Sequence, residues 1–290
     1  MQFGATFYKL SGSGNDFVAF DEMAASVPTL PDAERVRALC RRGTGVGADG
    51  VVVLGRSPGV DYQLVYYNRD GSRAELCGNA SLCSVRLAVE LGYGDPRGVR
   101  FRTDSGVLAG RMSDGLPEVD LQPATDLEPD RRDLLGQAAA GDERAVGFAR
   151  VGVPHVVVAC DDAARVDLAA RAPGLRHHPA LRDGANVNFV SRQGSDWAIR
   201  TFERGVEEET LACGTGSVAS ALLLAEWGDT GEPGPRDATR PTVVRLTTPS
   251  GMIHRVTLRG GDGGDDAWRP SLAGSARIVY RGELGEGDWS

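Results

Sequence analysis

The chain has 290 residues, 41% of them hydrophobic, which is enough for one large domain or two ordinary domains with their own cores. Its formal charge of −8 and its lack of a basic run argue against a nucleic-acid partner, and no apolar run is long enough to span a membrane. The five cysteines are irregularly spaced, unlike a disulfide framework, and four histidines without a CxxC motif argue against a zinc site. The first residues resemble no signal peptide. These properties favour a cytoplasmic protein that acts on a small molecule without a metal.

Short apolar runs bounded by glycine and aspartate predict strands along most of the chain. They lie at residues 5–10, 16–22, 50–55, 62–68, 99–103, 155–160, 186–192, 197–203, 242–248 and 276–284. Helical spacing predicts helices at 32–42 and 161–172, and two more after the cysteines discussed below. Each half of the chain is therefore predicted to be mostly β with a few helices.

Several segments rich in glycine, proline or aspartate interrupt these elements. The glycine segments 12–14 and 43–50 match neither the dinucleotide fingerprint nor the phosphate loop with its lysine, so we interpret both as tight turns. The stretch 120–134 is expected to cross between the two halves, and 228–241 and 260–270 are expected to be exposed loops.

Two stretches of the chain, each containing a cysteine before a helix, repeat one another. ELCGNASLCSVRLAVELGY (75–93) aligns without a gap with ETLACGTGSVASALLLAEWG (209–228), so that Cys77 falls on Cys213 at an offset close to half the chain length. This self-similarity indicates a duplicated domain. A helix N-terminus favours an anion, so a thiol placed there ionises more readily. Core packing would not require cysteine at both helix starts, and we therefore interpret both cysteines as reactive.

Two reactive thiols, one from each half, suit the inversion of a stereocentre. A thiolate can remove a proton from one face of a carbon while the partner thiol returns a proton to the other face. We expect the backbone N–H groups of Gly78, Asn79, Gly214 and Thr215 to hold a substrate carboxylate and stabilise the developing negative charge. A pyridoxal phosphate racemase would need a lysine, and the only lysine, Lys9, lies in a predicted strand. We therefore expect no cofactor.

Six motifs carry a resemblance to a known family. They are SGSGNDF (11–17), TGVGADG (44–50), NRDGSRAELCGN (68–79), GANVNF (184–189), FERGVEEETLACGTG (202–216) and SLAGSARIVYRGEL (271–284). Over nearly its whole length the chain resembles the diaminopimelate epimerase family. The resemblance implies an α+β fold of two pseudo-symmetric lobes, each a strongly curved, mostly antiparallel sheet wrapped around a central helix. It places the N-terminal lobe at 1–122 with 276–290 and the C-terminal lobe at 123–275.

The same resemblance implies an activity and a set of site residues. The activity is cofactor-independent epimerisation of LL- and meso-diaminopimelate, a step of lysine and peptidoglycan biosynthesis, with Cys77 and Cys213 as the catalytic pair. The implied substrate contacts are Asn15, Asn68, Asn186, Glu203 and Arg204, besides the helix-start residues Gly78, Asn79, Gly214 and Thr215. Glu203 suits the reacting ammonium, while Arg204, helped by Asn68 and Asn186, suits the distal carboxylate. The asparagines could instead satisfy local backbone, and the two charges could be exposed strand ends.

One departure from the family pattern bears on the substrate. Where the family has Gly-Asn-Pro-His, this chain has an apolar residue, Val153, in GVPH (152–155). A racemase of another amino acid on the same fold is therefore a second hypothesis. A protein that binds an amino acid without turnover is a third, and a redox role for Cys77 and Cys83 is a fourth. The expected partner is a small amino-acid substrate, with a homodimer left open.

Overall fold

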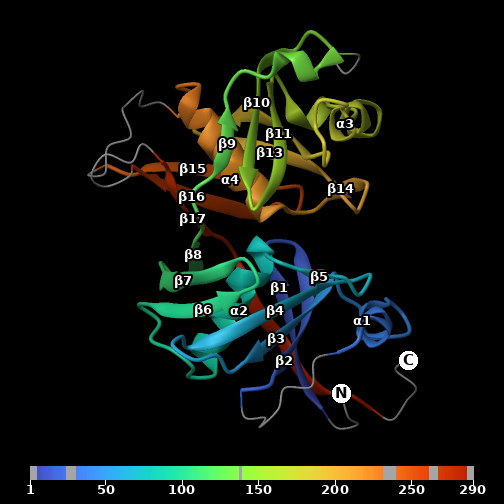
Figure 1. Cartoon of the computed structure of the whole chain (residues 1–290), viewed down its shortest axis with the longest axis vertical. Coiled ribbons are helices and arrows are strands. Elements are labelled where there is room, and N and C mark those ends of the chain that lie inside the picture. The colour runs from blue at the N-terminus through green and yellow to red at the C-terminus, as the bar shows by residue number, and fades with distance from the viewer. Residues whose placement is uncertain (1–4, 24–30, 137–138, 231–239, 261–266, 286–290) are drawn as a thin grey trace. The chain divides into compact units, whose positions relative to one another are not determined.

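A computed structural model describes residues 5–23, 31–136, 139–230, 240–260 and 267–285 (Figure 1). The chain forms two compact units, which we call unit 1 (Met1–Val119 with Ala273–Ser290) and unit 2 (Asp120–Leu272). Most of the loop expected at 228–241, and most of the one expected at 260–270, lies outside the described residues.

The described residues of unit 1 form a mixed sheet and two helices. Its elements are β1 (Thr6–Gly12), β2 (Asn15–Asp21), α1 (Ala33–Cys40), β3 (Gly50–Gly55), β4 (Tyr62–Asn68), β5 (Arg73–Ala74), α2 (Gly78–Glu90), β6 (Val99–Thr103), β7 (Gly106–Ser113), β8 (Leu116–Asp120) and β18 (Ala276–Glu283). Hydrogen bonds order its strands β18-β1-β2-β3-β4-β6-β7, with β5 beside β4. The pairs β2–β3 and β4–β6 are parallel and the others in this order are antiparallel.

Unit 2 has a sheet of the same kind. Its elements are β9 (Thr125–Glu128), the 3₁₀ helix η1 (Arg132–Leu134), β10 (Glu143–Val151), β11 (Val153–Cys160), the 3₁₀ helix η3 (Ala163–Arg165), α3 (Leu168–Arg176), β12 (Asn186–Gln193), β13 (Asp196–Glu203), β14 (Glu208–Thr210), α4 (Gly214–Glu226), β15 (Thr242–Thr247), β16 (Ile253–Arg259) and β17 (Arg269–Ala273). Its strands are ordered β9-β10-β11-β12-β13-β15-β16, with β14 beside β13.

The strand pairing of the two units is the same, which is the structural counterpart of the sequence repeat. In each unit a hairpin is followed by a parallel pair, a second hairpin and another parallel pair. The strands of the second parallel pair are connected through the helix that follows the cysteine, α2 or α4, which we call the cysteine helix. The parallel pairs are β2–β3 and β4–β6 in unit 1, and β11–β12 and β13–β15 in unit 2. The short strands β5 and β14 each lead directly to the cysteine that precedes α2 or α4. The duplication predicted from two short motifs therefore extends to the whole sheet of each unit.

Each sheet curves around the helix that follows its cysteine. Helix α2 lies against β1, β3, β4, β7 and β18, and α4 lies against β10, β11, β12, β15 and β16 (Figure 1). Every residue of α4 from Gly214 to Leu224 is buried. A helix that is apolar all round is expected to be enclosed by other elements. The fold is thus α+β, with a mostly antiparallel sheet wrapped around a central helix in each unit.

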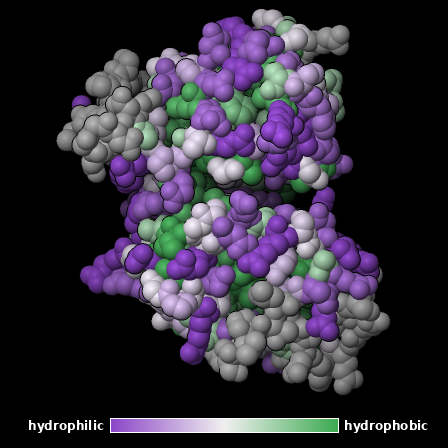
Figure 2. Space-filling model, in the orientation of Figure 1, coloured by the Kyte–Doolittle hydropathy of each residue, from purple (hydrophilic) through white to green (hydrophobic). Residues whose placement is uncertain are grey.

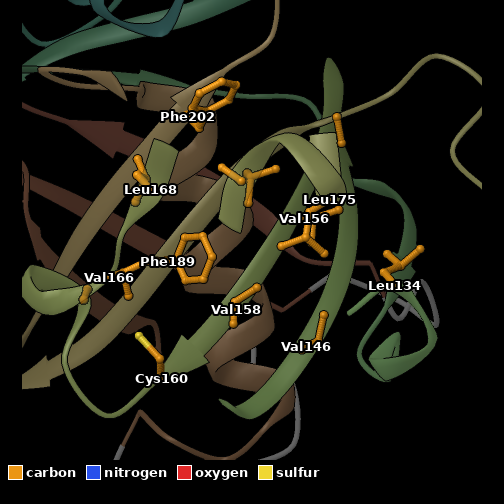
Figure 3. Packing of buried hydrophobic residues seen from close by; sticks show 14 of the residues in the cluster. Leu134, Val146, Val156, Val158, Cys160, Val166, Leu168, Leu175, Phe189 and Phe202 are labelled. Carbon is orange, nitrogen blue, oxygen red and sulfur yellow. The ribbon is translucent and has the colours of Figure 1, made fainter. Parts of the chain in front are cut away.

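A second helix covers the outer face of the sheet in each unit. In unit 2, Leu168 and Leu175 of α3 belong to the same buried cluster as Val156 and Val158 of β11 and Phe189 of β12, as Figure 3 shows. Because the side chains of a strand alternate between its two faces, β11 is buried on both sides. In unit 1, Val36 and Leu39 of α1 pack in a corresponding cluster on β2 and β3.

The helix predicted at 161–172 is wrong in its bounds. Asp162 accepts a hydrogen bond from Ala164 N and caps only the 3₁₀ turn η3, and a second cap, Asp167, accepts from Ala170 N and starts α3 at Leu168. Each aspartate competes for nearby backbone N–H groups, so the segment divides into two short helices. Helix α3 then continues through Pro173 to Arg176, beyond the predicted end.

Hydrophilic residues are spread over the face of each unit that Figure 2 shows, with hydrophobic residues between them. No helix among the described residues is long and apolar enough to cross a membrane.

Candidate functional site

Cys77 and Cys213 occupy the same position at the start of their helices. Cys77 is the N-cap residue of α2, with φ −135° and ψ 119°, and its carbonyl accepts a hydrogen bond from Ser81 N at 2.9 Å. Cys213 is the N-cap residue of α4, with φ −128° and ψ 108°, and its carbonyl accepts from Ser217 N at 3.0 Å. Each thiol therefore lies at the positive end of a helix dipole, and neither helix has an acidic residue in its first turn.

The other three cysteines lie in a different environment. Burial raises the pKa of Cys40 and of Cys160 to about 11 and raises that of Cys83 as well, so these thiols stay protonated at neutral pH. None of the five cysteines, all within the described residues, forms a disulfide. We interpret Cys40, Cys83 and Cys160 as packing residues.

In unit 1 the predicted contacts Asn15 and Asn79 lie together. Asn79 Nδ2 donates to Asn15 Oδ1 at 2.7 Å, which ties the start of β2 to the first turn of α2. This approach depends on Gly12, because a Cβ there would lie 2.6 Å from Cys83 Sγ and 3.1 Å from the Asn79 carbonyl oxygen. Asn68, at the end of β4, donates from Nδ2 to Ser72 Oγ at 3.0 Å. The structure thus brings Asn15 and Asn79 to the cysteine helix and gives Asn68 a local partner.

In unit 2 a buried asparagine that the sequence analysis missed lies against the first turn of α4. Asn188 Oδ1 accepts from Thr201 Oγ1 at 2.9 Å, and its Nδ2 donates to the Val156 carbonyl at 3.0 Å. A Cβ at Gly216 would lie 2.4 Å from Asn188 Oδ1 and 3.2 Å from Cys213 Sγ, so only glycine allows this contact. A polar residue between the apolar residues Val187 and Phe189 was the signal that could have identified Asn188.

Asn186 and Arg204 form a second group in unit 2, and Glu203 precedes Arg204 at the end of β13. Asn186 Oδ1 accepts a hydrogen bond from Arg204 N at 2.8 Å, and Asn186 Nδ2 donates to the Pro154 carbonyl at 3.4 Å. The Arg204 guanidinium donates from Nη1 to the Asp183 carbonyl at 3.2 Å. In the structure Asn186 therefore holds the backbone of Arg204 and joins it to the segment that contains Val153.

The loop after Arg204 is fixed by an ion pair. Glu207 accepts a hydrogen bond from Gly205 N at 3.0 Å and from Arg176 Nη2 at 2.8 Å, and Glu207 itself has a positive φ of 60°. A non-glycine residue in this conformation is strained, and the hydrogen bonds to its carboxylate offset that strain. Glu207 thus restrains the turn that presents Arg204.

Two fully buried histidines border the site elements of unit 2. Ser217 Oγ donates to the Cys213 carbonyl at 3.0 Å and lies 2.7 Å from His254 Nδ1, so Nδ1 carries the proton and donates to Ser217. Burial lowers the pKa of His254 to about 4, and burial together with the charge of Arg204 lowers that of His155 to about 3. Neither Nε2 atom has a hydrogen-bond partner among the described residues. Both imidazoles are therefore neutral at physiological pH.

The groups that could bind a metal or form a Schiff base were also located. Within the described ranges, no group of three or more His, Cys, Asp or Glu side chains is arranged to hold a metal ion. Lys9 is only 9% exposed, and its Nζ donates to Asp16 Oδ2 at 2.6 Å and to the Gly47 carbonyl.

Comparison with known proteins gives one consistent family. Residues 7–124 and 147–233 match the family model of diaminopimelate epimerase. The diaminopimelate epimerase of Gemmatimonas aurantiaca is 43% identical over 283 residues, which cover 96% of this chain and 99% of the relative. Those of Methanocella arvoryzae and Aquifex aeolicus are 38% and 34% identical and also cover 96% or more of both chains.

Solved structures with the same fold are more distant in sequence. A phenazine biosynthesis protein of the PhzF family from Bacillus anthracis superposes with a TM-score of 0.74 at 15% identity, covering 98% of this chain and 99% of its own. A probable proline racemase from Agrobacterium radiobacter superposes with a TM-score of 0.65 at 14% identity, covering 98% and 93%. These likenesses establish the fold, and the closer sequence matches establish the family: the chain belongs to the diaminopimelate epimerase family.

Proposed function

We propose that the protein is a pyridoxal-phosphate-independent epimerase that interconverts LL- and meso-diaminopimelate by a two-base mechanism. The observation that carries this proposal is the repeated helix start, in which Cys77 and Cys213 have the same N-cap conformation in topologically equivalent places. The relatives named diaminopimelate epimerase support the choice of substrate.

The proposed reaction moves one proton off the α-carbon and another onto it. The thiolate of one cysteine takes the α-proton, so that an S–H bond forms and the C–H electrons pass into the substrate carboxylate. The thiol of the other cysteine then gives its proton to the opposite face of the carbon, and its own S–H bond breaks. The pair is left with its protonation exchanged, ready for the reverse direction.

Helix N-termini supply the stabilisation that this carbanion needs. The N–H groups of Gly78 and Asn79 on α2, and of Gly214 and Thr215 on α4, lie in the first turns of their helices, and they suit the carboxylate on which negative charge grows. Such a reaction requires no electron sink from a cofactor. We assign the reacting ammonium to Glu203 and the distal carboxylate to Arg204, with Asn15, Asn68 and Asn186 as further contacts.

The proposed function is tested by exchange of the α-proton. Purified protein is incubated in deuterated water with LL-diaminopimelate, meso-diaminopimelate and a panel of other amino acids, and both deuterium uptake and stereochemistry are measured. We expect deuterium to enter diaminopimelate together with inversion. A protein that only binds amino acids would give neither, and exchange of a different amino acid alone would reassign the substrate.

Val153 supports a second candidate, a racemase of another amino acid on this fold. It lies at the start of β11, directly before Pro154, whose carbonyl accepts from Asn186. An apolar side chain at this position leaves one fewer hydrogen-bond donor for a distal carboxylate. A substrate with a less polar side chain would suit it better.

Replacing Val153 by asparagine separates these two candidates. If diaminopimelate is the substrate, Val153→Asn adds one hydrogen bond to a charged group, and we expect KM to fall about tenfold with little change in kcat. Val153→Leu, which adds no amide, should leave KM higher than Val153→Asn. If Val153→Asn instead lowers the turnover of another amino acid that the wild type prefers, while any diaminopimelate turnover rises, the second candidate is supported.

Location and assembly are parts of the same proposal. Two reactive thiols must stay reduced, which the cytoplasm favours. We propose a homodimer in which Val279 and Tyr280 of β18, 52% and 46% exposed, contact a second copy of the chain. Sedimentation velocity of the wild type and of Tyr280→Glu would test it, with a monomeric wild type as the contrary result.

A further inference from the structure

A chain of hydrogen bonds runs through unit 1 from the single lysine to the first turn of α2. Lys9 Nζ donates to Asp16 Oδ2 at 2.6 Å, and Arg42 Nη2 joins Asp16 Oδ1 at 2.6 Å to Asp49 Oδ1 at 3.0 Å. Asp49 Oδ2 then accepts from Asn15 Nδ2 at 3.0 Å. Asn15 Oδ1 in turn accepts from Asn79 Nδ2 at 2.7 Å, which brings the chain to the residue two positions after Cys77.

Both carboxylates in this chain have cations beside them: Lys9 and Arg42 beside Asp16, and Arg42 beside Asp49. Burial alone would raise the pKa of Asp16, but hydrogen bonds from Arg42 and Lys9 hold it below its usual value. The two cations and two carboxylates balance in charge, so the group can be buried in part without an unpaired charge. An ionised carboxylate accepts hydrogen bonds and donates none.

Because Asp49 can only accept, it determines which way the Asn15 amide points. The Nδ2 group must face Asp49, and Oδ1 must then face Asn79. One Nδ2 hydrogen of Asn15 is used by Asp49, and the second makes no hydrogen bond among the described residues. With the opposite orientation Asn15 would present a carbonyl, which repels an anion.

The backbone of Asp49 is held as firmly as its side chain. Asp49 N donates to the Asp16 carbonyl at 2.8 Å, and the Asp49 carbonyl accepts from Arg69 N, next to Asn68, at 3.1 Å. Ahead of it, Gly47 adopts φ +78° and its carbonyl accepts from Lys9. The glycine segment 43–50 thus contains a turn, as predicted, and it also places the Asp49 carboxylate within hydrogen-bonding distance of Asn15.

We propose that Asp49 is a positioning residue for substrate binding, which fixes the Asn15 amide so that an N–H group faces an anionic group of the substrate. This inference rests on the proposed function for Asn15 as a substrate contact. Arg42 and Lys9 serve it indirectly, by keeping Asp16 and Asp49 in place.

A double-mutant cycle between Asp49 and Asn15 tests the proposal. Asp49→Asn can offer Asn15 an amide donor in place of an acceptor, and we expect KM to rise about tenfold with kcat changed less than about twofold. In the Asn15→Ala background the same change should alter KM less than about twofold, because no amide remains to be positioned. An equal effect in both backgrounds, or none in either, would overturn the proposal.

Matched variants distinguish positioning from loss of stability. Asp61→Asn removes a carboxylate that accepts from Arg100 N at 2.6 Å elsewhere in unit 1, and it should leave KM unchanged. If Asp49→Asn does not fold, Asp49→Glu keeps the charge beside Arg42 but displaces the acceptor, and the same cycle is run with it. The Asn15 side-chain amide resonances give a readout apart from activity: they should shift in the Asp49 variant and not in Asp61→Asn.

The order of the experiments distinguishes a failure of the positioning proposal from a failure of the proposed function. Wild-type exchange in deuterated water is measured first, and if another amino acid exchanges in place of diaminopimelate, the cycle uses that amino acid. Unmoved Asn15 resonances in the Asp49 variant would refute the positioning role whatever the substrate.

Discussion

Cys77→Ala and Cys213→Ala should each abolish epimerisation, because inversion needs a base on one face of the α-carbon and an acid on the other. Removing a proton-transfer group typically costs about 10²–10⁴ in rate, and here no other group can replace the missing sulfur. The measurement is the rate of interconversion of LL- and meso-diaminopimelate, followed by stereochemistry rather than by substrate loss. Each single variant keeps one thiol, so it should still exchange deuterium into one stereoisomer.

Cys83→Ala provides the matched control for this pair. Cys83 lies on α2, the helix that Cys77 caps, but it is buried and its pKa is raised. Its loss should therefore affect stability and leave the rate of inversion near wild type. Inversion at the wild-type rate by either Cys77→Ala or Cys213→Ala would refute the two-base mechanism.

The folded protein should lose stability steeply as the pH falls below 6.5. His155 and His254 have pKa values lowered to about 3 and about 4 by burial, whereas in the unfolded chain a histidine titrates near 6.5. Below pH 6.5 the unfolded state therefore binds protons that the folded state does not. Each histidine lowers the free energy of unfolding by about 1.4 kcal/mol per pH unit until its folded-state pKa is reached. Urea unfolding at pH 7.5, 6.0 and 5.0 measures this slope.

Replacing one of the histidines should reduce the slope. His254→Asn keeps a donor near Ser217 but does not titrate, so its unfolding free energy should change less between pH 6.0 and 5.0 than that of the wild type, by about 1.4 kcal/mol. Val244→Ala, a buried change on the neighbouring strand β15, should lower stability equally at all three pH values. If the two variants show the same slope, buried neutral His254 is not the cause of acid unfolding.

The parts of the fold that the sequence predicted well are those with strong local signals. Both cysteine helices were expected from an alignment of two short stretches. Strands such as β3 and β11 were expected because nearly all of their residues are apolar, and in the structure these residues are buried. Strands β10 and β16 were missed, since arginine, glutamate or histidine interrupts their apolar pattern. Their pairing is set by neighbours distant in the sequence, which no local pattern shows.

The same limit applies to the candidate site. Cys77 and Cys213 stood out because they repeat, and their catalytic roles remain predictions. Asp49 and His254 gave no such signal: one lies in a glycine-rich turn, and the other lies in a strand with alternating polarity. Their importance arises from contacts with Asn15 and Ser217, residues 34 and 37 positions away. Contacts of this kind depend on the folded chain, so a single sequence does not show them.

The pairing of β1 with β18 also has a consequence for synthesis on the ribosome. Residues Thr6–Gly12 emerge before the whole of unit 2, but their antiparallel partner, Ala276–Glu283, emerges after it. Unit 2 is continuous from Asp120 to Leu272, so its sheet can form before β18 has left the ribosome. Unit 1, although translated first, keeps one edge of β1 unpaired until β18 emerges. Nascent chains should therefore acquire protease resistance in the middle of the sequence before they acquire it at the beginning.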